Sequence, residues 1–235
     1  MRVIMLLLLL APVVGDCQIW RNVAAESKNP GYALQPIGEF HGDEANLEDG
    51  SDWFALRCGE TCSVVSVRAA VAAEFDPLLD SEDEATGRRV RARGVPEALF
   101  LLRGTRLSRG TVLQSTLEES TGTNGDEEAP MTTRLVLGKK ELLLRRVVES
   151  AGGEVARVRV ILESGGRSQL LAESDSTDLA GYVLWSGDLD HDGEIDLVVD
   201  LSDHYNMSVP TLLLSSEAIG ADLVAAVATH VSTGC

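Results

Sequence analysis

Short runs of alternating apolar and polar residues, separated by turn residues, make up most of the chain after position 53. The pattern is clear in residues 155–162, where Arg157 and Arg159 alternate with apolar residues and mark one polar face. Turns recur at a spacing of roughly ten residues, and the glycine pair in residues 164–167 predicts a tight hairpin. This arrangement predicts an all-β fold, mainly an antiparallel sandwich, barrel or meander.

Two segments depart from this pattern. Residues 16–52 are acidic and rich in proline and glycine, so we expect an irregular N-terminal segment, either a mobile entry or a loop packed over the main domain. Residues 53–235 form the predicted β-rich domain. Near its end, the alanines of residues 217–228 allow one short C-terminal helix, whereas Val224, Val227 and Val231 equally suit a final strand.

Residues 1–15 have the composition of a bacterial signal peptide. Arg2 supplies the positive charge, an apolar run follows, and Gly15 ends a small-residue cleavage site. The apolar run is too short to span a bilayer, and no later segment approaches that length, so we expect no transmembrane segment in the mature chain. The protein is therefore expected to be secreted or periplasmic. Anchoring of an envelope lipoprotein through Cys17 is an alternative, but Asp16 is not the small residue that a lipidation signal places before its cysteine.

The net charge of the chain excludes some classes of binding partner. The net charge is −17 at pH 7, which repels nucleic acid and anionic lipid surfaces, so neither is an expected partner. An acidic exported protein instead meets abundant calcium outside the cell.

Four cysteines in an exported chain indicate disulfides, and they permit three pairings. Cys58 and Cys62 enclose three residues between the strand-like runs 53–57 and 63–67. A hairpin there would place the two cysteines opposite each other, so we predict a disulfide between them. The remaining pair, Cys17 and Cys235, would join the two ends of the chain.

Residues 187–199 carry the chemistry that stands out most in the sequence. Acidic residues occupy positions 1, 3, 5 and 9 of a loop with glycine at position 6, which is the spacing that wraps oxygen ligands around Ca²⁺. The predicted ligands are the side chains of Asp188, Asp190, Asp192 and Asp196 and the backbone carbonyl of Glu194. Gly193 permits the tight turn, and Ile195 is expected to point into the core.

The loop is not that of an EF-hand. Position 12, where an EF-hand has a bidentate glutamate, is Val199, and the flanking residues 181–186 and 195–200 are strand-like and too short for helices. In this setting the sequence Gly-Asp-Leu-Asp-His-Asp-Gly-Glu-Ile-Asp-Leu-Val-Val resembles the calcium loop of FG-GAP/VCBS-type repeats, which occur in integrin-like propellers and secreted bacterial proteins. The resemblance covers about residues 182–201 and implies a calcium loop between strands. No repeat of propeller length accompanies it, so a single copy is expected.

Standard catalytic motifs are absent from the sequence, including GxSxG, HExxH, the P-loop and GxGxxG. Asp203 and His204 could act as an acid–base pair or support the ion from outside its ligand shell. The interpretation that we favour is a turn that ends a strand.

We therefore expect an exported non-catalytic protein with one structural calcium site, which serves as a binding or structural module of the envelope or extracellular space. Its partner would be a protein or a glycan. The alternative is a secreted, calcium-stabilised hydrolase or carbohydrate-active enzyme with catalytic acids in its acidic loops. That alternative requires Asp203, His204 and an acid from residues 43–52 to meet in one pocket.

Overall fold

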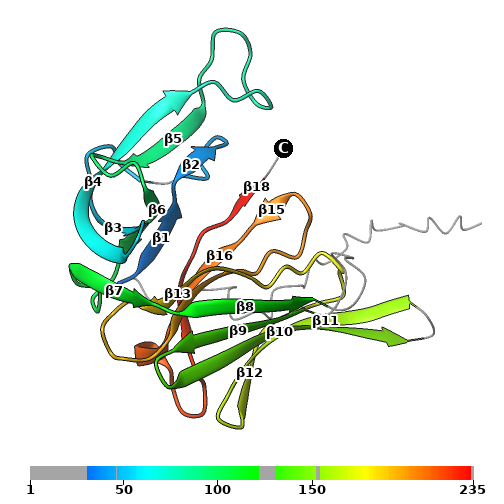
Figure 1. The fold of residues 1–235 in the computed structure, drawn as a ribbon. Helices are drawn as coiled ribbons and strands as arrows, with labels where there is room; N and C mark the ends of the chain where they lie inside the picture. Colours follow the sequence, from blue (N-terminus) through cyan, green and yellow to red (C-terminus); the bar gives the residue numbers. More distant parts are fainter. Residues whose placement is uncertain (1–30, 46, 122–130, 152–153, 234–235) are drawn as a thin grey trace, which may run out of the picture.

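The computed structural model describes residues 31–45, 47–121, 131–151 and 154–233. Within them every regular element is a β-strand, apart from the 3-10 turn η2 (Ser215–Glu217) (Figure 1). The predicted all-β antiparallel fold is confirmed. No helix in the described part of the chain has the length and apolar character needed to cross a membrane. The predicted signal peptide, residues 1–15, lies outside the described residues.

The largest sheet follows a path of nine antiparallel strands that curls into a nearly closed barrel. In sheet order the strands are β1 (Ala33–Pro36), β6 (Ala98–Arg103), β3 (Asp52–Cys58), β4 (Cys62–Glu74), β7 (Gly110–Gln114), β13 (Tyr182–Asp188), β14 (Asp196–Asp200), β16 (Pro210–Leu214) and β17 (Ala225–Thr229). β1, at one end of this path, lies against β16 and β17 at the other end. Off the path, β5 (Gly87–Ala92) pairs with β4, and β2 (Gly38–Phe40) pairs with β5.

A five-stranded meander forms the second sheet and lies along one side of the molecule, away from β2 and β5 (Figure 1). Its strands are β8 (Thr116–Thr121), β9 (Met131–Leu137), β10 (Lys140–Ala151), β11 (Glu154–Ser164) and β12 (Arg167–Ser174). The predicted hairpin at residues 164–167 joins β11 to β12, with Gly165 and Gly166 at φ 54° and 78°. A small third sheet pairs β15 (Met207–Ser208) with β18 (Ser232–Thr233).

Alternating side chains of the barrel strands supply two of the hydrophobic cores. All nine strands contribute to the barrel interior, through Leu34, Leu56, Val64, Leu102, Val112, Trp185, Val198, Leu212 and Val227 among others. β14 also contributes Leu197 and Val199 to the core that the meander forms against the outside of the barrel. β14 is therefore buried on both of its faces.

The fold corrects one prediction from the sequence and decides between two alternatives that the sequence left open. Within the segment expected to be irregular, Ala33–Pro36 and Gly38–Phe40 form β1 and β2, because β6 and β5 supply the backbone hydrogen-bond partners that short, proline-containing stretches cannot provide for themselves. Within residues 217–228 the described chain forms no α-helix. It leaves η2 and enters β17, since pairing with β16 outweighs the helix propensity of the alanines.

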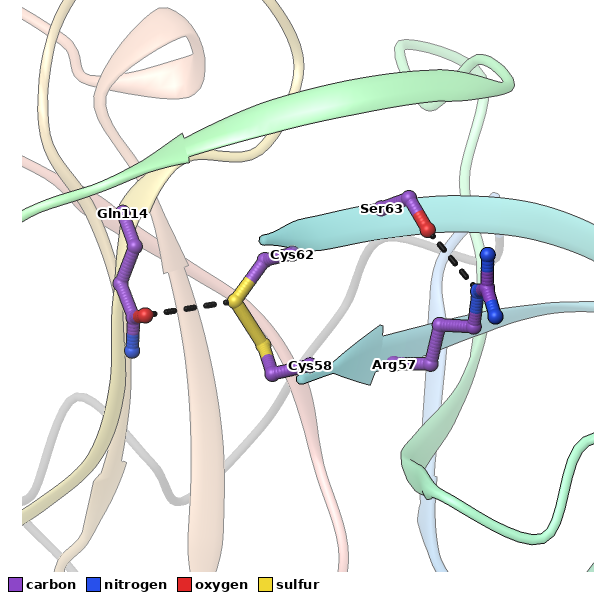
Figure 2. The surroundings of a disulfide bond; sticks show 5 residues. All are labelled: Arg57, Cys58, Cys62, Ser63 and Gln114. Atoms are coloured by element: carbon purple, nitrogen blue, oxygen red, sulfur yellow. Dashed lines mark hydrogen bonds between the residues drawn. A yellow bond between two sulfur atoms is a disulfide. The ribbon is translucent and has the colours of Figure 1, made fainter. Parts of the chain in front are cut away.

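The predicted disulfide between Cys58 and Cys62 closes the β3–β4 hairpin (Figure 2). The two Cα atoms are 4.1 Å apart and face each other in the strand register. Gln114 of β7 places its Oε1 3.4 Å from the sulfur of Cys62, so the hairpin end lies beside β7, which in turn pairs with β13 at the start of the acidic loop. The second predicted pair, Cys17 and Cys235, lies outside the described residues.

Candidate metal centre

The acidic loop connects two neighbouring strands of the barrel, as predicted. β13 and β14 are antiparallel and their register ends at Gly187 opposite Asp196. Asp188 is the last residue of β13 and Asp196 the first of β14. The first and ninth positions of the loop are therefore fixed by the sheet, and only the residues between them depend on the loop conformation.

The backbone of the loop turns through two left-handed residues. Gly193 has φ 82°, as its predicted role requires, and His191 has φ 66°. A side-chain residue in this region costs conformational free energy. The His191 ring is exposed, but its Nε2 lies 3.1 Å from the carbonyl oxygen of Thr111 on β7. This hydrogen bond holds His191, with its left-handed backbone, against β7.

Three carboxylates of the loop meet at one point. Asp188, Asp190 and Asp196 each offer an oxygen, and these atoms all lie within 4.8 Å of one another. Asp188 is 8% exposed and Asp196 is fully buried. Two negative charges at this separation repel by about 3 kcal/mol at an effective dielectric constant near 20. We call these residues the aspartate trio.

The surroundings of the aspartate trio disfavour its negative charge. Burial, together with the nearby charge of Asp190, raises the pKa of Asp196 to about 7, although the hydrogen bonds from Ser215 and Leu189 act in the opposite direction. Burial also raises the pKa of Asp190, and the charges of Asp192 and Asp188 act in the same direction. A bound cation would offset this cost, because its positive charge opposes the mutual repulsion of the three carboxylates.

Among the three aspartates, Asp188 gives the clearest indication of an ion-binding site. Its Oδ1 is buried and has no hydrogen-bond partner among the described residues. An unpaired buried carboxylate oxygen is costly. Asp196 differs, since it accepts hydrogen bonds from the backbone N–H groups of Leu189 at 2.8 Å and Ser215 at 2.9 Å. A metal ion at the centre of the trio would give the Asp188 oxygen its missing partner.

The turn η2 forms a second wall of the site. Ser216 donates its hydroxyl to Asp190, and the Ser215 hydroxyl lies 2.9 Å from Asp192 Oδ2 and 3.0 Å from Asp196 Oδ1. No motif in the sequence marks these two serines as part of the site. They follow β16 directly, and only the pairing of β14 with β16 brings them beside the loop.

Two predicted ligands lie outside the aspartate trio. Asp192 is exposed, and its Oδ1 accepts the backbone N–H of Glu194 at 2.7 Å. The side chain of Glu194 pairs with Lys140, the first residue of β10 in the meander. The side chain of Asp192 and the carbonyl of Glu194 as ligands therefore stay predictions. Ile195 is 3% exposed and packs between the barrel and the meander, as expected.

Asp203 and His204 lie beyond the other end of β14. Five residues of strand, about 16 Å in length, separate them from the loop. Asp203 Oδ2 is 3.5 Å from the Ser174 hydroxyl, and the His204 ring is 4.8 Å from the ring of Tyr205. The described residues that line the pocket containing His204 include none from 43–52, so the convergence required by the enzyme alternative is not seen there.

The arrangement can hold a metal ion through three aspartate carboxylates that the ends of β13 and β14 bring together. The donors are all oxygen atoms, which suits a hard cation. No protein-family model, curated protein or solved structure matches the chain, so the site rests on its own geometry.

Proposed function

We propose that the protein is an exported, non-catalytic binding or structural module whose β13–β14 loop holds one structural Ca²⁺ ion. The observation that carries this proposal is the buried Asp188 Oδ1, which has no hydrogen-bond partner within the part of the chain that the structure describes and belongs to the same cluster as the carboxylates of Asp190 and Asp196. Among common metal ions, Zn²⁺ favours nitrogen and sulfur ligands, and Mg²⁺ favours small octahedral sites that retain several waters. An all-oxygen site within one loop suits Ca²⁺ best.

The position of the site supports a structural role. An ion there would bind Asp188 at the end of β13 and Asp196 at the start of β14, and both strands are central to the barrel. Outside the cell calcium is constantly present, so the ion would stabilise rather than signal. At a calcium concentration 100 times the Kd, binding adds about 2.7 kcal/mol to the free energy of unfolding.

Export of the chain is part of the proposal. The disulfide between Cys58 and Cys62 is compatible with an oxidising compartment. The signal-peptide composition of residues 1–15 and the resemblance of residues 182–201 to FG-GAP/VCBS calcium loops point in the same direction.

Thermal unfolding of the exported protein tests the calcium site. We expect Ca²⁺ to raise the Tm relative to a chelator, and equal Mg²⁺ to raise it much less. Asp188→Asn and Asp190→Ala should abolish the calcium-dependent rise, because each removes a charged ligand of the aspartate trio. Asp203→Asn is the matched control, since Asp203 lies beyond the far end of β14, and it should keep the full rise.

An unchanged Tm on chelation, or an equal calcium response in the two trio variants and the control, would contradict the calcium site.

The variant Asp192→Ala tests whether Asp192 is a ligand of the ion. If Asp192 swings in to ligate the ion, its variant should lose most of the calcium affinity. If it stays hydrogen-bonded to Glu194 and Ser215, the affinity should change little.

A further inference from the structure

A pocket of about 360 Å³ lies beyond the end of β14 that is opposite the acidic loop. Its lining includes Tyr182, His204, Tyr205, Arg146, Asp178 and Ser202. None of the aspartate trio contributes to it. We call it the tyrosine pocket.

The tyrosine pocket gathers aromatic side chains that are otherwise scarce at the surface. Aromatic residues make up 4% of the chain. Among the described residues, the exposed large aromatic side chains are Phe75, Tyr182 and Tyr205, and the two tyrosines line this one pocket. Tyr205 is 83% exposed, and the ring of His204 lies 4.8 Å from its ring at an interplanar angle of 32°. Exposed tyrosines grouped at a cavity present large, amphipathic faces to a ligand.

Backbone hydrogen bonds fix the two segments that form the pocket walls. The N–H of Ala180 donates to the carbonyl of Ser202 at 2.7 Å, and the N–H of Gly181 donates to the carbonyl of Asp200 at 2.8 Å. Arg146, which is 4% exposed, donates its Nε to the carbonyl of Leu179 at 2.7 Å. It also donates a second guanidinium N–H to the Thr177 carbonyl. The pocket is therefore preformed, as most small-molecule sites are.

The charges around the pocket disfavour an anionic ligand. Asp178 and Asp200, together with the net charge of −17, oppose an anion. The guanidinium of Arg146, the one arginine or lysine among the described residues of the lining, already donates to the carbonyls of Leu179 and Thr177. A neutral ligand rich in hydroxyl groups avoids this repulsion, and its hydroxyls can donate to the carboxylates and exchange hydrogen bonds with the hydroxyl of Ser202.

We propose that the tyrosine pocket binds a neutral carbohydrate. Tyr182 and Tyr205 contact the apolar face of a pyranose ring, and polar groups of the lining, Ser202 among them, bind its hydroxyls. The proposal names the ligand class of the binding role stated under Proposed function, but it rests on different residues from the calcium loop.

Saturation-transfer difference NMR of the exported protein in calcium, followed by calorimetry, tests this inference. The probes are neutral trisaccharides: maltotriose, cellotriose, mannotriose, galactotriose and tri-N-acetylchitotriose. We expect at least one to bind, and Tyr182→Ala and Tyr205→Ala each to weaken it roughly ten-fold through loss of ring contact. Phe75→Ala is the matched control, since Phe75 is exposed outside the pocket, and its affinity should equal that of the wild type. The Tm of all three variants should stay near that of the wild type.

The inference is overturned if no trisaccharide binds the folded protein. It is also overturned if binding is unaffected by both tyrosine variants, or if tetramethylammonium or inorganic phosphate binds the pocket in place of the sugars. The two proposals fail separately. Sugar binding that persists in a protein without a calcium response refutes the calcium site alone, whereas a calcium-stabilised protein that binds none of the sugars refutes the carbohydrate pocket alone.

Discussion

Leu189 and Ile195 stand inside the acidic loop, six positions apart, and pack into different hydrophobic cores. Leu189 is fully buried in the barrel interior, and Ile195 is 3% exposed in the core between the barrel and the meander. The acidic side chains between them are thus held by two apolar anchors. The loop conformation depends on both cores at once.

Shortening one of these anchors should weaken both the fold and the metal site. We expect Ile195→Ala to lower the free energy of unfolding by about 2–5 kcal/mol. It should also lower calcium affinity, because Ile195 precedes Asp196 directly. Urea unfolding in chelator gives the first quantity, and calorimetric titration of Ca²⁺ gives the second. Ile219→Ala is the control, since Ile219 is 82% exposed, and its effect should stay within about 0.5 kcal/mol. Equal losses in the two variants would contradict the anchoring role.

Gly187 allows β13 to approach β7 more closely than any side chain permits. A Cβ atom at this position would lie 2.3 Å from the carbonyl oxygen of Leu113 and 2.9 Å from the ring of Trp185. Gly187→Ala should therefore force the two strands apart and destabilise the protein by about 1–3 kcal/mol or more. Gly59→Ala is the matched control, because nothing lies within 4 Å of a Cβ built there. Chemical unfolding of the two variants tests the expectation, which fails if both behave alike.

The disulfide should contribute modestly to stability because the loop it closes is short. For a closed loop of five residues, the chain-entropy model gives about 2 kcal/mol. Replacing Cys58 and Cys62 together by alanine should lower the free energy of unfolding by about this amount. Wild-type protein treated with a reductant should match the double variant, and the reductant should leave the variant itself unchanged. A loss near zero would show that the β3–β4 pairing alone holds this hairpin.

His230 should make the protein less stable in mild acid. Burial lowers the pKa of His230 below its usual 6.5, and its Nε2 has no hydrogen-bond partner among the described residues. Above about pH 6.5 the imidazole is neutral in both the folded and the unfolded state, so there is no free-energy cost of burying a charged ring. As the pH falls below 6.5, the unfolded chain takes up the proton first, and stability declines until the pH reaches the lower folded pKa.

The free energy of unfolding, measured in chelator at pH 7.5 and 5.5, checks this expectation. Without metal, the raised pKa of Asp196 stabilises both proteins as the pH falls, so the comparison between them isolates His230. His230→Gln removes the titrating imidazole, so the change in its free energy of unfolding from pH 7.5 to 5.5 should be less destabilising than that of the wild type. Phe40→Leu is the control. It removes the ring that packs edge-on against His230 at 5.1 Å but keeps the imidazole, so it should lower stability at both pH values and keep the pH dependence. An equal change in His230→Gln and the wild type would contradict the assignment.

The features that the sequence predicted correctly are local. Cys58 and Cys62 sit across a three-residue loop between two clear strands, so their pairing follows from the length of the hairpin. The carboxylates of Asp188 and Asp196 meet because the strands on either side pair in the register that the flanking residues favour. Neither inference needs any contact with a distant part of the chain.

The features that the sequence missed come from long-range pairing. Ala33 pairs with Arg103, and no local pattern in such a short, proline-ended stretch marks it as a strand. Ser215 and Ser216 reach the loop only because β16 lies beside β14. Ligand spacing likewise gives the order of the acids but not their side-chain rotamers, so it could not separate Asp192 from the aspartate trio.

The burial of β14 on both faces leaves its alignment to be set by polar groups. In a half-buried strand, a slip of one residue would expose the apolar face, and this cost fixes the register. In β14 the same slip would only exchange Val198 with its equally apolar neighbours, at little hydrophobic cost. The aspartates at its two ends are not interchangeable in this way. The carboxylate of Asp196 accepts hydrogen bonds from the backbone N–H groups of Leu189 and Ser215. The carboxylate of Asp200 accepts them from the backbone N–H groups of Ser202 and Val209. β14 is therefore aligned by its two terminal aspartates, one of which also belongs to the candidate metal centre.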